Sequence, residues 1–234
     1  MSDDFDKVSG VGELPLFPLP LVLFPGVPLP LHIFEPRYRR LLADIRVSNN
    51  LFGLPHFDTD ASAGDRPAVG HIGCVAEVVE VQPLPDGRSN ILVVGLVRYR
   101  LDAYVEQDEP YLVGHVTVFE DEEEDEDLLA ARAEKVTALF LRIARSVRII
   151  NDDRADLPEM PTDEPERLSF LVAAAMELDI EVKLELLETR STAERLGRIG
   201  EMLAQVVGNY EERARAHSVA RGNGHAGKHL DLNE

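Results

Sequence analysis

The most unusual stretch of the sequence is an uncharged, mostly apolar run near its start. Residues 14–34 contain no Asp, Glu, Lys or Arg, and 21 residues are enough to cross a bilayer as a helix. Six prolines interrupt the run: Pro15, Pro18, Pro20, Pro25, Pro28 and Pro30. Each proline costs about 3 kcal/mol in a helix interior. The run therefore predicts extended pieces at 14–19, 21–24 and 27–33, on edge or irregular strands, and no membrane helix.

An amphipathic segment follows. Pro36 suits a helix start, because the N–H that proline lacks would have no partner there. Apolar residues recur at i, i+3, i+4 and i+7, which is the spacing of one helix face. They are Tyr38, Leu41, Leu42 and Ile45. We expect a short helix with Arg37, Arg39 and Arg40 on its solvent side.

The rest of the first half has the pattern of short strands. Residues 51–57 and 112–119 each predict one strand. Residues 73–81 and 91–101 predict a hairpin, because Asp86-Gly87 between them favours a tight turn. About seven short strands and one helix predict a small, irregular, closed or half-closed sheet.

The spacing of apolar residues changes from that of strands to that of helices in the second half of the chain. Apolar residues from Ala133 to Ile150 are spaced three and four apart, as on one stripe of a helix. Further helices are expected after Asp163, over 180–188, and after a capping box at 191–194. The last helix should bury one face, made of Leu196, Ile199, Leu203, Val206 and Tyr210. Four helices with short links predict a compact bundle.

Composition and charge suggest where one part ends and the next begins. The chain has 24 Lys and Arg against 43 Asp and Glu, a formal net charge of −19. Eight of the acids are consecutive, at 120–127. The expected organisation is a β-rich part at 1–119, an acidic junction at 120–127, helices at 128–220 and a disordered tail at 221–234. The charge disfavours nucleic acids and anionic membranes as partners.

The sequence offers little for catalysis. Its single cysteine, Cys74, lies in an apolar strand and is expected to be buried and inert. One cysteine also fits a reducing compartment, and the acidic start does not resemble a secretory leader, so a cytoplasmic protein is expected. No nucleophile elbow or metal-binding cluster is evident, so neither a cofactor nor a metal is expected.

Aromatic residues are the strongest candidates for binding. Along the first half they could line a groove that takes an extended peptide by strand addition. The candidates are Phe17, Phe24, Phe34, Tyr38, Phe52, Phe57, Tyr99 and Tyr104. Taken singly, most of them are expected to pack in the β core. As a group they favour a binding module over an enzyme.

Several segments resemble the N-terminal, substrate-binding domain of the Lon protease family. They are LPLFPLP from Leu14, LFPG from Leu23, LPLHIFEPRY from Leu29, GHIG from Gly70, LPDGR from Leu84 and VGLVRY from Val94. The likeness is closest to small bacterial proteins that consist of this domain alone. It implies an α+β fold, in which a PUA-like β pseudo-barrel with one inserted helix precedes an α-helical bundle.

The resemblance also implies a function. In the full proteases this domain recognises unfolded protein, and ATPase and Ser-Lys peptidase modules follow it. No position of this sequence matches the catalytic residues of the family. We therefore expect a non-catalytic protein that binds unfolded or extended polypeptides, with a protease or chaperone as a further candidate partner.

Two alternatives remain open at the level of sequence. The first is a small hydrolase whose site the sequence does not reveal. The second is an RNA binder, because PUA-like folds include such domains. RNA binding would require a local basic patch, for which the candidates are Arg37, Arg39, Arg40, Arg98 and Arg100.

Overall fold

The structure is a computed structural model that describes residues 3–58 and 65–224. Its contacts divide the chain into two compact units. The first, which we call the β unit, consists of residues up to 123 together with 170–191. The second, the helix unit, consists of 124–169 and the chain from 192 onward. In the described part of the chain, no helix has the length and apolar character needed to span a membrane.

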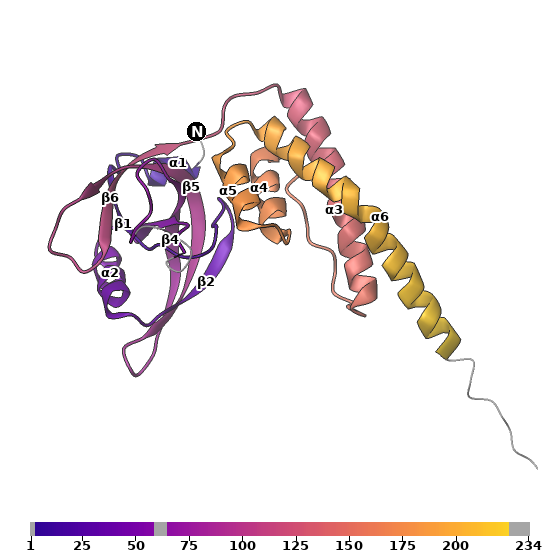
Figure 1. Ribbon diagram of the computed structural model, residues 1–234, viewed down its shortest axis with the longest axis horizontal. Helices are drawn as coiled ribbons and strands as arrows, with labels where there is room; N and C mark the ends of the chain where they lie inside the picture. Colours follow the sequence, from indigo (N-terminus) through magenta and orange to yellow (C-terminus); the bar gives the residue numbers. More distant parts are fainter. Residues whose placement is uncertain (1–2, 59–64, 225–234) are drawn as a thin grey trace, which may run out of the picture. The chain divides into compact units, whose positions relative to one another are not determined.

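The β unit is built on six strands (Figure 1). Its elements in the first half of the chain are α1 (Asp3–Lys7), β1 (Glu13–Leu16), β2 (Pro28–Ile33), α2 (Pro36–Arg46), β3 (Leu51–Pro55), β4 (Ile72–Pro83), β5 (Ser89–Val105) and β6 (Leu112–Phe119). The strand order is β2-β5-β4-β3-β1-β6, and β5 also pairs with β6. The sheet thus folds back on itself as a pseudo-barrel. It is not a regular closed barrel, because β2 pairs with β5 alone among the described strands.

The proline-rich run forms less regular structure than predicted. Only Glu13–Leu16 and Pro28–Ile33 are strands, and the piece expected at 21–24 is not one. Leu19 makes just an isolated parallel bridge to His56. The N–H of Leu19 donates to the oxygen of Pro55, and its own oxygen accepts from the N–H of Phe57, so the pairing with the β3 side continues as far as this residue. Pro25 and Gly26 form a turn before β2, with Gly26 at a positive φ of 73° that favours glycine.

Other predicted elements of the β unit are confirmed. The strand at 112–119 has the expected bounds, and β4 and β5 form the expected hairpin, each longer than predicted. Helix α2 buries its predicted apolar face on the sheet. These buried residues are Tyr38, Leu41, Leu42 and Ile45.

The helix unit is a pair of long helices, α3 (Glu126–Ile150) and α6 (Thr192–Gly224). They run side by side in the same direction (Figure 1), with Arg132 against Ala193 near their starts and Arg142 paired with Glu211 further along. Helix α6 begins where the predicted capping box places it. Its buried face includes Val207, whereas the predicted Val206 is 38% exposed.

The two shorter helices do not join the long pair in one bundle as expected. Helix α4 (Pro165–Ala175) crosses from the helix unit into the β unit, and α5 (Ile180–Glu188) belongs to the β unit. Phe170 explains why, because it is fully buried and stacks on Phe24 with ring centroids 5.9 Å apart. At the expected tail, residues 221–224 continue α6, and 225–234 lie outside the described residues. The predicted α+β class, with a β pseudo-barrel and a C-terminal helical region, is confirmed.

Candidate functional site

Strand β2 has one face in the core and one face in solvent. The N–H of Gly95 donates to the oxygen of Val27 over 3.1 Å, so the odd-numbered residues of β2 direct their backbone groups toward β5. Side chains also alternate between the two faces of the strand, and those of Leu29, Leu31 and Ile33 pack in the core. The even-numbered residues Pro28, Pro30 and His32 are exposed.

Phe34 extends this exposed face beyond the end of β2. Its side chain is 58% exposed, and its ring stacks on His32 with the centroids 6.0 Å apart and an interplanar angle of 21°. Pro28, Pro30, His32 and Phe34 therefore form a row of exposed rings along β2, which we call the ring stripe. Exposed aromatic surface of this kind favours a binding role.

Polar neighbours fix the orientation of the ring stripe. His32 Nδ1 and Asn90 Oδ1 are 2.7 Å apart, and Asn90 Nδ2 donates to Gln82 Oε1 over 3.5 Å. These contacts cross from β2 over β5 to β4 on the outer face. These contacts hold the His32 imidazole in a fixed position on the outer face.

The structure separates the eight aromatic candidates. Six are buried, with at most 9% of the residue exposed: Phe17, Phe24, Tyr38, Phe52, Phe57 and Tyr99. Tyr104 is half-buried and its hydroxyl donates to the oxygen of Pro67 over 2.6 Å. Burial raises the pKa of Tyr104 to about 12. Phe34 is the one largely exposed member, so the eight residues do not line a common accessible groove.

The arginine candidates do not form a free basic patch. Arg37 pairs with Glu35 at 2.9 Å, Arg40 with Asp44 at 2.9 Å, and Arg100 with Asp102 at 2.8 Å. Arg98 is buried. Four of the five arginines are thus already matched by carboxylates, which weakens the case for RNA binding.

Arg98 has a structural role that the sequence pattern did not reveal. It pairs with Asp121 and donates to the backbone oxygens of Leu187 at 3.0 Å and Thr189 at 2.8 Å. Its guanidinium also lies over the rings of Phe119 and Phe170. These contacts attach residues 187–189 to β5 inside the β unit. Asp121 would have suggested a buried ion pair only if the burial of Arg98 had been known, and the sequence pattern does not show that burial.

No catalytic arrangement is evident in the described residues. The Cys74 thiol is fully buried and burial raises its pKa, which makes it a poor nucleophile. The described ranges also contain no cluster of three or more His, Cys, Asp or Glu able to hold a metal ion.

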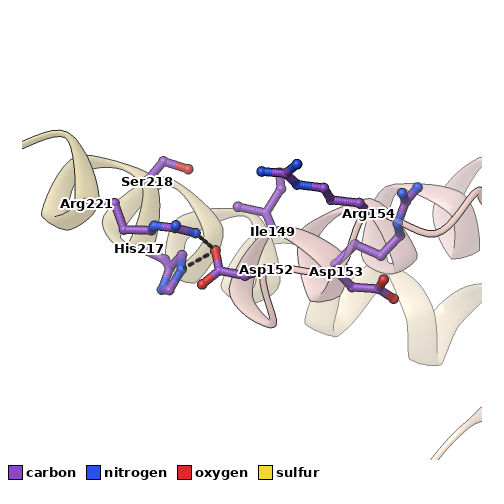
Figure 2. Close-up of a pocket in the computed structure, with 8 residues that line it drawn as sticks. Ile149, Asp152, Asp153, Arg154, His217, Ser218 and Arg221 are labelled. Atoms are coloured by element: carbon purple, nitrogen blue, oxygen red, sulfur yellow. Dashed lines mark hydrogen bonds and ion pairs between the residues drawn. The ribbon is translucent and has the colours of Figure 1, made fainter.

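The helix unit has one polar hollow where α3 ends beside α6 (Figure 2). Asp152, at a positive φ of 54°, accepts from His217 Nε2 over 3.2 Å and from Arg221. The Asp152 carboxylate thus already pairs with His217 and Arg221, and two further arginines, Arg148 and Arg154, line the same hollow. The arrangement attaches the end of α6 to the residues after α3 and does not point to a ligand.

Comparison with known families identifies the chain's relatives. The model of the ATP-dependent protease La (LON) substrate-binding domain matches residues 13–205. The chain belongs to this family. The resemblance noted in the sequence is therefore confirmed, and it extends beyond the β-rich half into the helices.

Curated relatives of the family are full proteases. A Lon protease from Brevibacillus choshinensis is 28% identical over 206 residues, which cover 87% of this chain and 26% of the relative. A Lon protease from Parabacteroides distasonis is 33% identical over 131 residues, or 53% of this chain and 16% of the relative. The chain thus spans about a quarter of the length of the first of these relatives.

Solved structures of the family share the fold. A Lon N-terminal domain protein from Xanthomonas campestris has a TM-score of 0.57 at 24% identity, with 80% of this chain and 96% of that chain covered. The N-terminal domain of a Lon protease from the Mycobacterium avium complex has a TM-score of 0.60 at 19% identity, with coverages of 82% and 98%. At these identities the likeness establishes the fold alone.

Proposed function

We propose that this protein binds unfolded or extended polypeptides without cleaving them, through the outer face of β2. The observation that supports the binding role is the match of residues 13–205 to a substrate-binding domain family. The ring stripe supports the location. It combines an exposed Phe34 with a preorganised His32 on a strand that has a free side.

The lack of catalytic groups in the described residues fits a binding role. The region that matches the family is its substrate-binding domain, and the one thiol is buried. Hydrolysis would need a nucleophile, a base within hydrogen-bond reach and donors for an oxyanion, and no such set was found there.

A titration can test the proposal directly. Fluorescein-labelled, unfolded casein would be titrated with the protein and followed by fluorescence anisotropy, with intact casein after incubation as the readout for cleavage. We expect micromolar binding and no cleavage. Phe34→Ala should weaken binding by about fivefold to tenfold, because removing an exposed aromatic anchor costs about 1–1.4 kcal/mol.

The chain offers a matched control. Val69 is 59% exposed, almost the same as Phe34, but lies outside the ring stripe. Val69→Ala should therefore bind casein as the wild type does. Absence of binding by the wild type would contradict the function, and equal losses in both variants would contradict the location.

A further inference from the structure

The outer edge of β2, which pairs with no second strand among the described ones, is poor in hydrogen-bond donors. Its odd-numbered residues face β5, so the outward backbone groups belong to Pro28, Pro30 and His32. Proline has no N–H. The edge therefore presents three carbonyl oxygens but one N–H, that of His32. An added strand would find no donor at two of the three positions, and the proline rings occupy the space where it would lie.

The same face carries a carboxylate with no ion pair. Glu80 pairs in register with Leu92, which pairs with Pro30, so all three lie in one row across the sheet. Glu80 is exposed, and none of the described cationic side chains forms an ion pair with it. Together with the edge carbonyls and the net charge of −19, it makes this face complementary to basic groups.

We propose that the outer face of β2 holds an extended segment of apolar and basic residues by its side chains, without adding that segment to the sheet as a further strand. This inference rests on the proposed function and specifies its ligand. Apolar side chains would contact the ring stripe. Lysine or arginine side chains would donate to the edge carbonyls and to Glu80. Because the client backbone is not paired, proline in the client would be tolerated.

Backbone N-methylation separates the two modes of binding. A labelled, unstructured ten-residue peptide of Phe, Leu and Lys would be compared with two versions that are N-methylated at every second residue, one in each register. A strand pairs through alternate residues, so strand addition requires at least one methylated version to lose tenfold or more in affinity. We expect both to bind within about threefold of the parent.

The basic preference has its own test. Replacing each Lys of the peptide by norleucine keeps the apolar stem and removes the charge. We expect the wild type to prefer the Lys peptide, and Glu80→Gln to weaken the Lys peptide by about twofold to fivefold, the range of an exposed ion pair. The norleucine peptide should bind both proteins equally. Glu106→Gln, at an exposed position outside this face, is the matched control.

The outcomes distinguish this inference from the proposed function. If neither casein nor the parent peptide binds, the proposed function fails. If both bind but one N-methylated version loses tenfold, the client is added as a strand and the inference is wrong. Equal affinity of the Lys and norleucine peptides for the wild type would also overturn it.

Discussion

The β unit has a covered region and an open region, built from similar kinds of residue. In the covered region, Arg98 lies between Phe119 and Phe170 beneath residues 170–191 and is 1% exposed. In the open region, His32 and Phe34 stack in the same way on the outer face of β2, and Phe34 is 58% exposed. A cationic or imidazole group beside an aromatic ring is thus buried in one place and exposed in the other.

The difference lies in what covers each region. Arg98 and Arg100 lie two residues apart on the same face of β5, but only Arg98 is reached by the segment around Leu187. A remote segment therefore decides which basic and aromatic residues hold the fold together. The residues that it does not cover, such as Phe34 and Arg100, remain exposed.

The largest expected effect comes from removing the centre of the covered region. Arg98→Ala should lower the free energy of unfolding by about 3–5 kcal/mol, because it removes one partner of a buried ion pair with Asp121. Arg100→Ala, which breaks an exposed pair with Asp102, should cost less than about 1 kcal/mol. Urea denaturation of both variants measures the difference. Equal losses would show that burial does not separate the two arginines.

Adjacent residues at the end of β2 sharpen the contrast. Ile33 is 2% exposed in the core, so Ile33→Ala should cost about 2–5 kcal/mol of stability. Phe34→Ala should change stability by less than about 0.5 kcal/mol while weakening casein binding. The same urea titrations, run beside the anisotropy assay, check both. A large loss of stability for Phe34→Ala would show that Phe34 stabilises the fold, which would contradict this contrast.

Replacing the edge prolines should open the edge of β2 to strand pairing. The double variant Pro28→Ala and Pro30→Ala restores two outward N–H groups, which makes the edge a template for another strand. We expect concentration-dependent self-association in sedimentation velocity. The double variant should also bind at least one N-methylated peptide fivefold or more weakly than the parent peptide. Pro158→Ala, at an exposed position of the helix unit, is the control and should stay like the wild type. A double variant with unchanged behaviour would show that the prolines do not block the edge.

The smallest expected effect is a pH dependence at His71. Burial, and then the nearby His56, lower the pKa of His71, and its Nε2 is buried without a hydrogen-bond partner. The unfolded chain thus binds a proton more readily than the folded one. The contribution of neutral His71 to the free energy of unfolding is therefore complete above pH about 6.5. It decreases as the pH falls from there toward the lower pKa that His71 has in the folded state.

Thermal unfolding at pH 7.5 and 5.5 measures this dependence. The Tm of His71→Asn should decrease less from pH 7.5 to pH 5.5 than the Tm of the wild type. If His71→Asn follows the wild type, another group controls the acid sensitivity.

Much of the fold was predictable because local pattern reports local structure. The spacing of Tyr38, Leu41, Leu42 and Ile45 predicted the buried face of α2, and 112–119 predicted β6 with its bounds. The acidic run was less transparent. It was expected as a junction, but Asp121 pairs with Arg98, Glu124 accepts from the N–H of Ala193 at the start of α6, and Asp125 caps α3. Each role depends on a partner far away in the sequence or on a helix start.

The sequence did not reveal which of the aromatic candidates would be exposed. The sequence pointed to aromatic residues in the proline-rich half, yet six of the eight are core residues and one is half-buried. The position of β2 beside β5 alone among the described strands follows from strand order, which alternation along one strand does not encode.

By itself, the sequence determined most of the elements, the lack of two N–H groups in β2 and the family resemblance, because each depends on residue type and short-range spacing. Only the tertiary structure decided that residues 170–191 join the β unit, that Arg98 is buried while Arg100 is not, and that the ring stripe stays in solvent. The physical reason is that burial depends on which distant segments pack together, and such long-range packing produces no periodic pattern of apolar residues in the sequence.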